Sequence, residues 1–238
     1  MPIVRRDTLR SQLADALRDE ILAGRLAAGQ GITVRQLAEQ YGVSATPVRE
    51  ALVDLAAQGL LDVEEHRGYT VHAFTAAEFR SLIEARTIVI GGLFRSAGNG
   101  VLRPARPEAL AAMRRRGEEA ERAAKAGDID VLVHYDLRFW REIGALSGNP
   151  YLTEFLDGVR VRCWVFAVPL LRGRADLTTV FWRGQGALVD AIEQRDPAAV
   201  ESIVRAYNLH SLELIDRLTG AESRPDHYAG PAPDTEPG

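Results

Sequence analysis

The chain has 238 residues, a formal net charge of −4 and a single cysteine, Cys163. Its hydrophobic content of 46% and charged content of 26% are those of a globular protein, and its length suits two modest domains or one large one. One cysteine excludes an intramolecular disulfide and a cysteine metal cluster. No apolar run reaches the length of a membrane span, and the start of the chain lacks the apolar core of a signal peptide. We therefore expect a cytoplasmic protein with no membrane partner.

The stretch from Thr33 to Leu60 predicts two short helices joined by a tight turn. Thr33 can cap the first helix, with Gln36 as its capping-box partner, and Gly42 ends that helix. Ser44 is the expected cap of the second helix, which has a core-facing stripe of helical spacing. The stripe consists of Val48, Ala51, Leu52 and Leu55. Polar residues at the exposed start of this helix suit the major groove of DNA, although an ordinary pair of packed helices has the same pattern.

The flanking residues predict a winged helix-turn-helix. Residues 7–24 repeat an apolar side chain every four positions, which indicates a helix, and residues 26–32 are expected to form a loop. Residues 60–63 and 69–74 predict two strands. The turn between these strands, the expected wing tip, consists of His66, Arg67 and Gly68. Three helices followed by a two-stranded hairpin favour DNA binding over an ordinary helix pair.

The charge balance does not by itself indicate a nucleic-acid partner. Residues 1–74 hold eight arginines against ten acidic residues. A positive surface that contacts DNA must therefore be local, and arginine suits it because its side chain can chelate phosphate or guanine through two hydrogen bonds.

Three runs, EILAGRL, LAEQYGVSATPVREALVDLAAQGLL and RGYTV, resemble the N-terminal domain of GntR-type bacterial transcription regulators. The resemblance covers residues 8–74 and implies contact with DNA by residues of the helix pair and the wing. These are Arg35, Ser44, Thr46, Arg49, His66, Arg67 and Gly68. The family commonly has SRTPVREAL where this chain has SATPVREAL, so Ala45 replaces an arginine that usually contacts DNA. One lost bidentate contact to guanine changes discrimination by about 1–3 kcal/mol, so we expect a different operator.

Residues 75–220 predict a second domain, an all-α bundle of about six helices. Capping and glycine signals place these helices at 75–97, 108–126, 128–146, 151–171, 177–194 and 196–218. The second of them is rich in charge and is expected to be largely exposed. Residues 221–238 are rich in proline and glycine and are expected to be disordered.

Four of these helices place polar side chains on or beside their apolar face. They are Arg86, Asp136 with Trp140 one turn further on, Gln185, and Tyr207 with Ser211. A buried charge without a partner is too costly to persist, which leaves two alternatives. Either Arg86 and Asp136 form an ion pair beside hydrogen-bonded Gln185 and Tyr207, or these groups line a ligand cavity.

The runs DLRFWREIGALSGNPYL and LVDAIEQRDPAAVESIVRAYNL are similar to the effector-binding helical domain, the FCD domain, of the FadR group of GntR regulators. Six helices indicate the shorter, VanR-like branch. The resemblance implies a divalent metal held by one aspartate and three histidines. The aspartate matches Asp136, but the histidine positions hold Trp140, Gln185 and Tyr207. We therefore predict that the metal site has been lost and that no cofactor is bound, unless His134 or His210 forms a shifted site.

These patterns predict a ligand-responsive transcription regulator. We expect a homodimer that sets two recognition helices on a palindromic operator in double-stranded DNA, with repression as the family habit. Without a metal, Arg86 is the expected anchor for a carboxylate or another small organic anion. The other expected effector-binding residues are Asp136, Trp140, Gln185 and Tyr207.

Two other functions fit parts of the sequence. A DNA-binding scaffold whose helical domain dimerises but binds no ligand would have a filled core around Arg86 and Tyr207. An enzyme with an appended DNA-binding domain is disfavoured, because no G-x-S-x-G, H-E-x-x-H, P-loop or G-x-G-x-x-G motif is present. Cys163 lies in an apolar stretch that suits packing. We therefore predict no catalytic residue.

Overall fold

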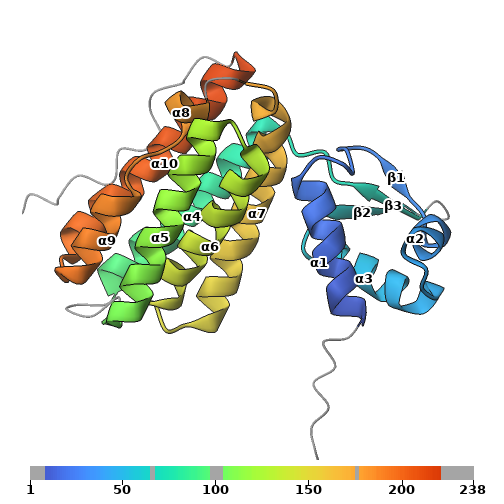
Figure 1. The fold of residues 1–238 in the computed structure, drawn as a ribbon, viewed down its shortest axis with the longest axis horizontal. Helices are drawn as coiled ribbons and strands as arrows, with labels where there is room; N and C mark the ends of the chain where they lie inside the picture. Colours follow the sequence, from blue (N-terminus) through green and yellow to red (C-terminus); the bar gives the residue numbers. More distant parts are fainter. Residues whose placement is uncertain (1–8, 65–67, 97–103, 175–176, 221–238) are drawn as a thin grey trace, which may run out of the picture.

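A computed structural model describes residues 9–64, 68–96, 104–174 and 177–220 of the chain. A small N-terminal domain of helices and strands lies beside a larger helical bundle (Figure 1). The predicted fold class, a winged helix-turn-helix followed by an all-α bundle, is confirmed. No helix in the described ranges is long and apolar enough to cross a bilayer. The expectation of disorder for 221–238 lies outside the described residues.

The N-terminal domain contains three helices and three short strands. In chain order these are α1 (Leu9–Leu22), β1 (Gly31–Ile32), α2 (Val34–Tyr41), α3 (Ala45–Ala57), β2 (Leu61–Glu64) and β3 (Gly68–Val71). Thr33 and Gln36 form the predicted capping box, and Gly42 ends α2 in the left-handed conformation at φ 64°. The predicted stripe of α3 is fully buried against α1, which fixes the position of α3.

The wing sheet has three strands in the order β1-β3-β2, all antiparallel. The prediction that 26–32 forms only a loop was therefore wrong. Ile32 of β1 pairs with Tyr69 of β3, and Val63 of β2 pairs with the other edge of Tyr69. A two-residue strand is too short to show a periodic pattern in the sequence. Its hydrogen bonds come from a partner far along the chain, so the neighbouring residues do not predict it.

The helical bundle follows after a second capping box, in which Thr75 and Glu78 exchange hydrogen bonds. Its helices are α4 (Ala76–Ser96), α5 (Pro107–Ala126), α6 (Ile129–Ala145), α7 (Pro150–Leu171), α8 (Leu177–Val180), α9 (Gln185–Glu193) and α10 (Pro197–Thr219). The starts of α6, α7 and α10 are capped by side-chain oxygens of Asp128, Asn149 and Asp196.

Two predictions for the bundle were wrong. Helix α5 is not largely exposed, because Met113, Ala120 and Ala124 on one face are buried in the core. The helix expected over 177–194 is broken between α8 and α9, since residues 181–184 leave the helical conformation. The break brings side chains of this segment against the interior of the bundle.

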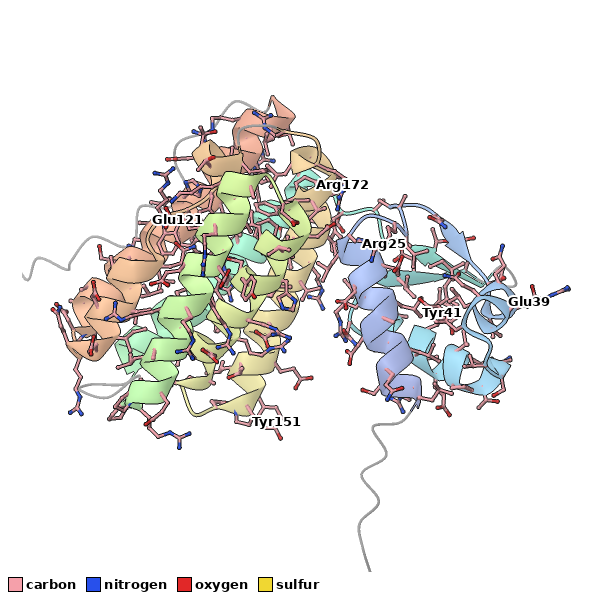
Figure 2. All side chains as sticks on the ribbon, in the orientation of Figure 1. Arg25, Glu39, Tyr41, Glu121, Tyr151 and Arg172 are labelled. Atoms are coloured by element: carbon pink, nitrogen blue, oxygen red, sulfur yellow. The ribbon has the colours of Figure 1, made fainter. Side chains whose placement is uncertain are left out.

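The two domains meet where α1 lies along α7. Figure 2 labels Arg25 and Arg172 on the two sides of this junction. The chain itself crosses at residues 72–75, between β3 and α4. His72 lies in this crossing and contacts carboxylates of both domains, Asp62 of β2 at 2.9 Å and Glu78 of α4 at 3.1 Å.

Candidate nucleic-acid interface and effector cavity

The proposed DNA contacts of the helix pair lie on exposed surface. Ser44, Thr46 and Arg49 lie at the start of α3 and are exposed, while its apolar stripe faces the core. Ser44 occupies the N-cap position, but its side chain makes no capping hydrogen bond. Arg35 of α2 is 88% exposed and pairs with Glu39 on its own helix, at 2.9 Å. Such a solvated pair is worth little, so a phosphate group can replace Glu39 at small cost.

The wing tip is only partly described. His66 and Arg67 lie outside the described residues. Gly68 begins β3 at φ 102°, and a Cβ atom there would lie 2.9 Å from the carbonyl oxygen of Ile32. Glycine at this position is therefore required by the sheet, whatever the wing contacts.

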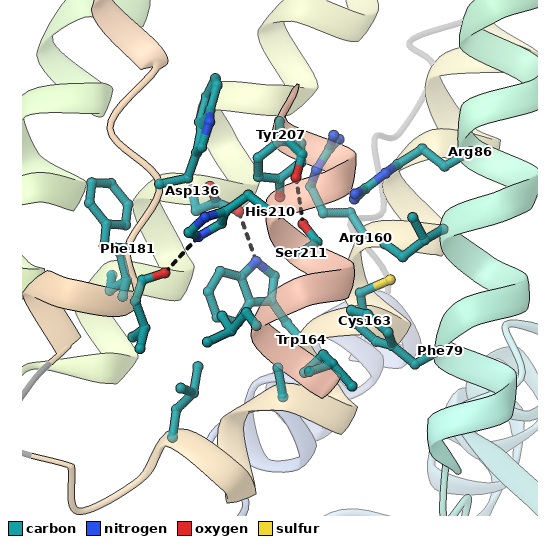
Figure 3. A pocket seen from close by; sticks show the side chains of 18 of the residues that line it. Phe79, Arg86, Asp136, Arg160, Cys163, Trp164, Phe181, Tyr207, His210 and Ser211 are labelled. Carbon is teal, nitrogen blue, oxygen red and sulfur yellow. Dashed lines mark hydrogen bonds between the residues drawn. The ribbon is translucent and has the colours of Figure 1, made fainter. Parts of the chain in front are cut away.

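A cavity of about 70 Å³ lies inside the bundle, between α4, α6, α7, the α8–α9 segment and α10. Its lining includes four of the five predicted effector-binding residues: Arg86, Asp136, Gln185 and Tyr207 (Figure 3). The fifth, Trp140, does not line this cavity. Its ring packs behind that of Tyr207, with ring centroids 4.4 Å apart. The rest of the lining is mostly apolar and includes Phe79, Ile83, Leu132 and Phe181.

Arg86 lies in this cavity with part of its guanidinium unpaired. It is only 1% exposed, yet its Nε and Nη2 atoms have no hydrogen-bond partner in the part of the chain that the structure describes. The alternative of a direct Arg86–Asp136 ion pair is not found among the described residues. Asp136 instead accepts a hydrogen bond from Nε1 of Trp164 at 2.8 Å. The guanidinium of Arg86 lies 4.8 Å from the ring centre of Tyr207, a cation–π contact that leaves N–H donors free.

A second buried arginine, Arg160 of α7, also lines the cavity and was not anticipated from the sequence. Its guanidinium lies 4.3 Å from the ring centre of Trp140, and its Nε atom has no partner. A signal was available, because Arg160 shares its helical face with Cys163, Trp164 and Ala167, at spacings of three, four and seven. An arginine on the apolar face of the most apolar long helix indicates a buried charge that requires a partner.

Two buried guanidinium groups and one buried carboxyl group line the cavity, and burial lowers the pKa of the Arg160 guanidinium. Burial raises the pKa of Asp136, although Arg160, the hydrogen bond from Trp164 and Arg86 oppose this shift. Burial also raises the pKa of Tyr207, which favours its neutral phenol form. Two guanidinium groups thus face at most one carboxylate, and their unpartnered donors are available to an anion.

Two family models match the chain, one over the part that holds α3 and one over the part that holds the cavity. The model of the FCD domain matches residues 76–209, more than half of the chain, and that of the bacterial regulatory proteins of the gntR family matches residues 9–71. The chain is a GntR-family transcription regulator with an FCD domain. These families comprise regulators rather than enzymes.

The regulator is similar to several characterised and uncharacterised relatives. It is 28% identical over 197 residues to a probable D-xylose utilization operon transcriptional repressor of Paenarthrobacter nicotinovorans, covering 82% of this chain and 84% of that one. It is 25% identical over 208 residues to the Bacillus subtilis regulator YdhC, covering 87% and 91%. The structure of E. coli McbR/YncC has the same fold, with a TM-score of 0.71 at 22% identity over 91% of this chain and 99% of that one.

The residues of the regulator do not fit a metal. At the positions implied for ligands stand Asp136, Trp140, Gln185 and Tyr207, and neither an indole nor a neutral phenol is a good ligand for a divalent ion. His210 lines the cavity, but its Nε2 atom donates to the carbonyl oxygen of Val180 at 2.8 Å. His134 is exposed on α6 and does not line the cavity. Within the described ranges no three His, Cys, Asp or Glu side chains converge as a possible metal site.

The break between α8 and α9 closes one side of the cavity. Phe181, Trp182 and Gln185 all contribute to its lining. Trp182 folds back over Gly184, so closely that a Cβ atom on Gly184 would lie 2.0 Å from the indole ring. The Trp182 ring then packs on Tyr207, with centroids 4.9 Å apart. The loss of helical structure at 181–184 therefore positions an aromatic wall.

Proposed function

We propose that this regulator is an effector-responsive repressor whose helical domain binds a small organic carboxylate and thereby changes its affinity for an operator. Residues 1–74 would contact DNA, and residues 75–220 would bind the effector and dimerise. The observation that carries the effector class is the pair of buried arginines, Arg86 and Arg160, with three N–H donor atoms that have no partner. An unpaired buried cation is costly, and a carboxylate that bridges both guanidiniums removes that cost.

The cavity favours a compact monocarboxylate with an apolar part. Arg86, Arg160 and an ionised Asp136 leave one positive charge uncompensated, which a single carboxylate neutralises. The lining beyond these groups is mostly hydrocarbon and aromatic. A relative is named for a D-xylose operon, but a neutral sugar would leave both arginines without an anion.

The DNA-binding half of the proposal rests on the exposed start of α3. A two-fold homodimer would present two such helices to successive turns of a palindromic operator, with Arg35, Ser44, Thr46 and Arg49 toward the DNA. Repression is proposed because the Paenarthrobacter relative is named as a probable transcriptional repressor. A scaffold without a ligand is the second candidate, but it would need a filled core, and Arg86 and Tyr207 both line a cavity.

Titration with acetate, isobutyrate and benzoate, each against its neutral amide, tests the effector class. We expect at least one acid to raise the unfolding temperature and to bind in calorimetry, while its amide does neither. At a hundredfold excess over Kd the stabilisation would be about 2.7 kcal/mol. Chelator should change nothing.

Two variants and one control sharpen this test. Arg86→Met and Arg160→Met should each abolish acid-dependent stabilisation, while Arg205→Met, on the exposed face of α10, should retain it. Equal binding of acid and amide would contradict the proposal, as would an Arg86→Met variant with unchanged affinity. A stabilisation that EDTA removes would contradict the loss of the metal.

A further inference from the structure

The recognition helix α3 is fastened at its C-terminal end to α7. The Nε atom of Arg162 donates a hydrogen bond to the carbonyl oxygen of Gln58, the C-cap residue of α3, at 2.8 Å. The guanidinium also packs on Gly59, where a Cβ atom would lie 3.4 Å from Arg162 Nε. The last carbonyl groups of a helix lack partners within it and carry partial negative charge, so a cation is well placed there.

Gln58 is tied to a second helix through its side chain. Its Oε1 atom accepts hydrogen bonds from Nε and Nη2 of Arg18 on α1, at 3.3 and 3.1 Å. At the C-cap of α7, Arg172 Nη2 donates to the carbonyl oxygen of Ala23, just after α1, at 2.7 Å. Helix α7 thus holds the C-terminal ends of both α1 and α3 through arginine side chains.

The same helix forms one wall of the cavity. Arg160, Cys163, Trp164 and Ala167 of α7 line it, and Arg162 lies between them in sequence but on another side of the helix. Two residues along an α-helix turn the side chain by about 200°, so Arg160 and Arg162 face almost opposite directions. Because a helix moves as a stiff unit, a ligand in the cavity that displaces the cavity-facing side of α7 also displaces the side that bears Arg162.

We propose that α7 transmits occupancy of the cavity to the DNA-binding domain, with Arg162 as the positioning residue that makes α3 follow α7. The transmission step rests on the proposed effector function, but the Arg162–Gln58 link does not. A ligand that engages Arg160 would displace α7, and Arg162 would carry the end of α3 with it. The orientation of the recognition helix, and so the fit of a dimer to its two half-sites, would change.

A double-mutant cycle tests this without an identified effector. Cys163→Leu adds side-chain volume inside the cavity from α7 and so imitates an occupant. Binding to the DNA upstream of the protein's own gene is measured by mobility shift for the wild type, Cys163→Leu, Arg162→Gln and the double variant. We expect Cys163→Leu to change the Kd by about fivefold or more in the native background and by less than about twofold with Arg162→Gln. Arg205→Gln, a matched surface arginine, should leave the full effect of Cys163→Leu in place.

Hydrogen exchange supplies an independent readout of the link. Exchange of the amides of Gly59 and Leu60, which bond to carbonyls of the last turn of α3, should be about fivefold or more faster in Arg162→Gln than in Arg205→Gln. Unchanged exchange would overturn the link. If Cys163→Leu does not fold by thermal unfolding, Ala167→Val serves as the cavity-filling variant.

The outcomes separate this inference from the proposed function. An equal effect of the cavity-filling variant with and without Arg162 overturns the transmission through α7, and so does no effect in the native background. If an acid binds the protein and weakens its binding to DNA equally in the wild type and in Arg162→Gln, the proposed function stands and the inference fails. If no acid binds but the cycle shows coupling, the inference stands and the effector class is wrong.

Discussion

The start of α3 and the interior of the helical bundle both carry arginines, in opposite settings. Arg49 is exposed on a helix whose other face is packed in the core, so its donors are open to solvent and, in the proposed complex, to DNA. Arg86 and Arg160 are almost fully buried, and several of their donors have no partner. A solvated arginine costs the fold little free energy, whereas an unpaired buried arginine carries a large desolvation cost.

Substitutions of exposed and of buried arginines should therefore have different effects. An exposed arginine contributes little to the free energy of unfolding, so its loss should affect the partner alone. A buried group at the cavity is held by the fold around it, and a change there should alter both the stability of the fold and the ligand site. Measuring binding and unfolding on the same variant therefore distinguishes the two settings.

The largest effect is expected at the recognition helix. Arg49→Ala should weaken binding to the DNA upstream of the protein's own gene by roughly 5- to 150-fold, because a bidentate base contact contributes about 1–3 kcal/mol. The unfolding temperature should not change, since Arg49 is exposed. Mobility shift and thermal unfolding measure the two quantities, with Arg205→Ala as the control. Undiminished DNA binding would show that α3 does not read the operator through this residue.

The next effect is expected at the aromatic wall of the cavity. Gly184→Ala places a methyl group where the Trp182 ring lies, so either Trp182 or the start of α9 must shift. We expect a loss of about 1–3 kcal/mol in the free energy of unfolding, measured in urea. Gly186→Ala is a matched control, because no atom lies within 4 Å of its Cβ position and alanine favours a helix interior. Equal stability of the two variants would contradict the packing of Trp182 over Gly184.

The smallest effect is a pH dependence from Asp136. Burial raises its pKa in the folded protein, and a bound carboxylate nearby would raise it further, so binding takes up a proton between the two values. Benzoate affinity should therefore fall as the pH rises through the folded-state pKa of Asp136, by at most about tenfold per pH unit. Calorimetry in two buffers of different ionisation enthalpy measures the uptake.

The same shift has a defined sign for stability. Because the folded-state pKa of Asp136 lies above the unfolded-state value, its contribution is fully present below the unfolded-state pKa and is lost as the pH rises through the folded-state value. Asp136→Asn should remove both dependences. A benzoate affinity with the same pH profile in Asp136→Asn and wild type would assign the linkage to another group.

Local chemistry explains how much of this fold was predictable. The capping boxes at Thr33 and Thr75 lie within four residues, so their sequence signal is complete. The stripe of α3 and the inward position of Arg86 follow from helical periodicity alone. These features needed no knowledge of the rest of the molecule.

The features that the sequence did not predict depend on distant partners. Strand β1 forms by pairing with β3 at Tyr69, far along the chain. The break at 181–184 accompanies the packing of Trp182 on Tyr207 of another helix. Arg160 was not predicted, because the sequence alone does not distinguish it from Arg162, which lies two residues further along α7 and bonds to the N-terminal domain. Whether an arginine on such a helix faces a cavity or a neighbouring domain depends on how the helix is rotated, and only packing decides that.

The placement of the tryptophans gives the protein an optical property. The chain has three, and Trp164 and Trp182 line the cavity while Trp140 stacks against Tyr207 behind it. None lies in the DNA-binding domain. Intrinsic fluorescence excited at the indole band therefore originates entirely beside the cavity, with one emitter hydrogen-bonded to Asp136 and another covered by the Arg160 guanidinium. Binding of the proposed effector would therefore change a signal that contains no emission from the N-terminal domain, without any added label.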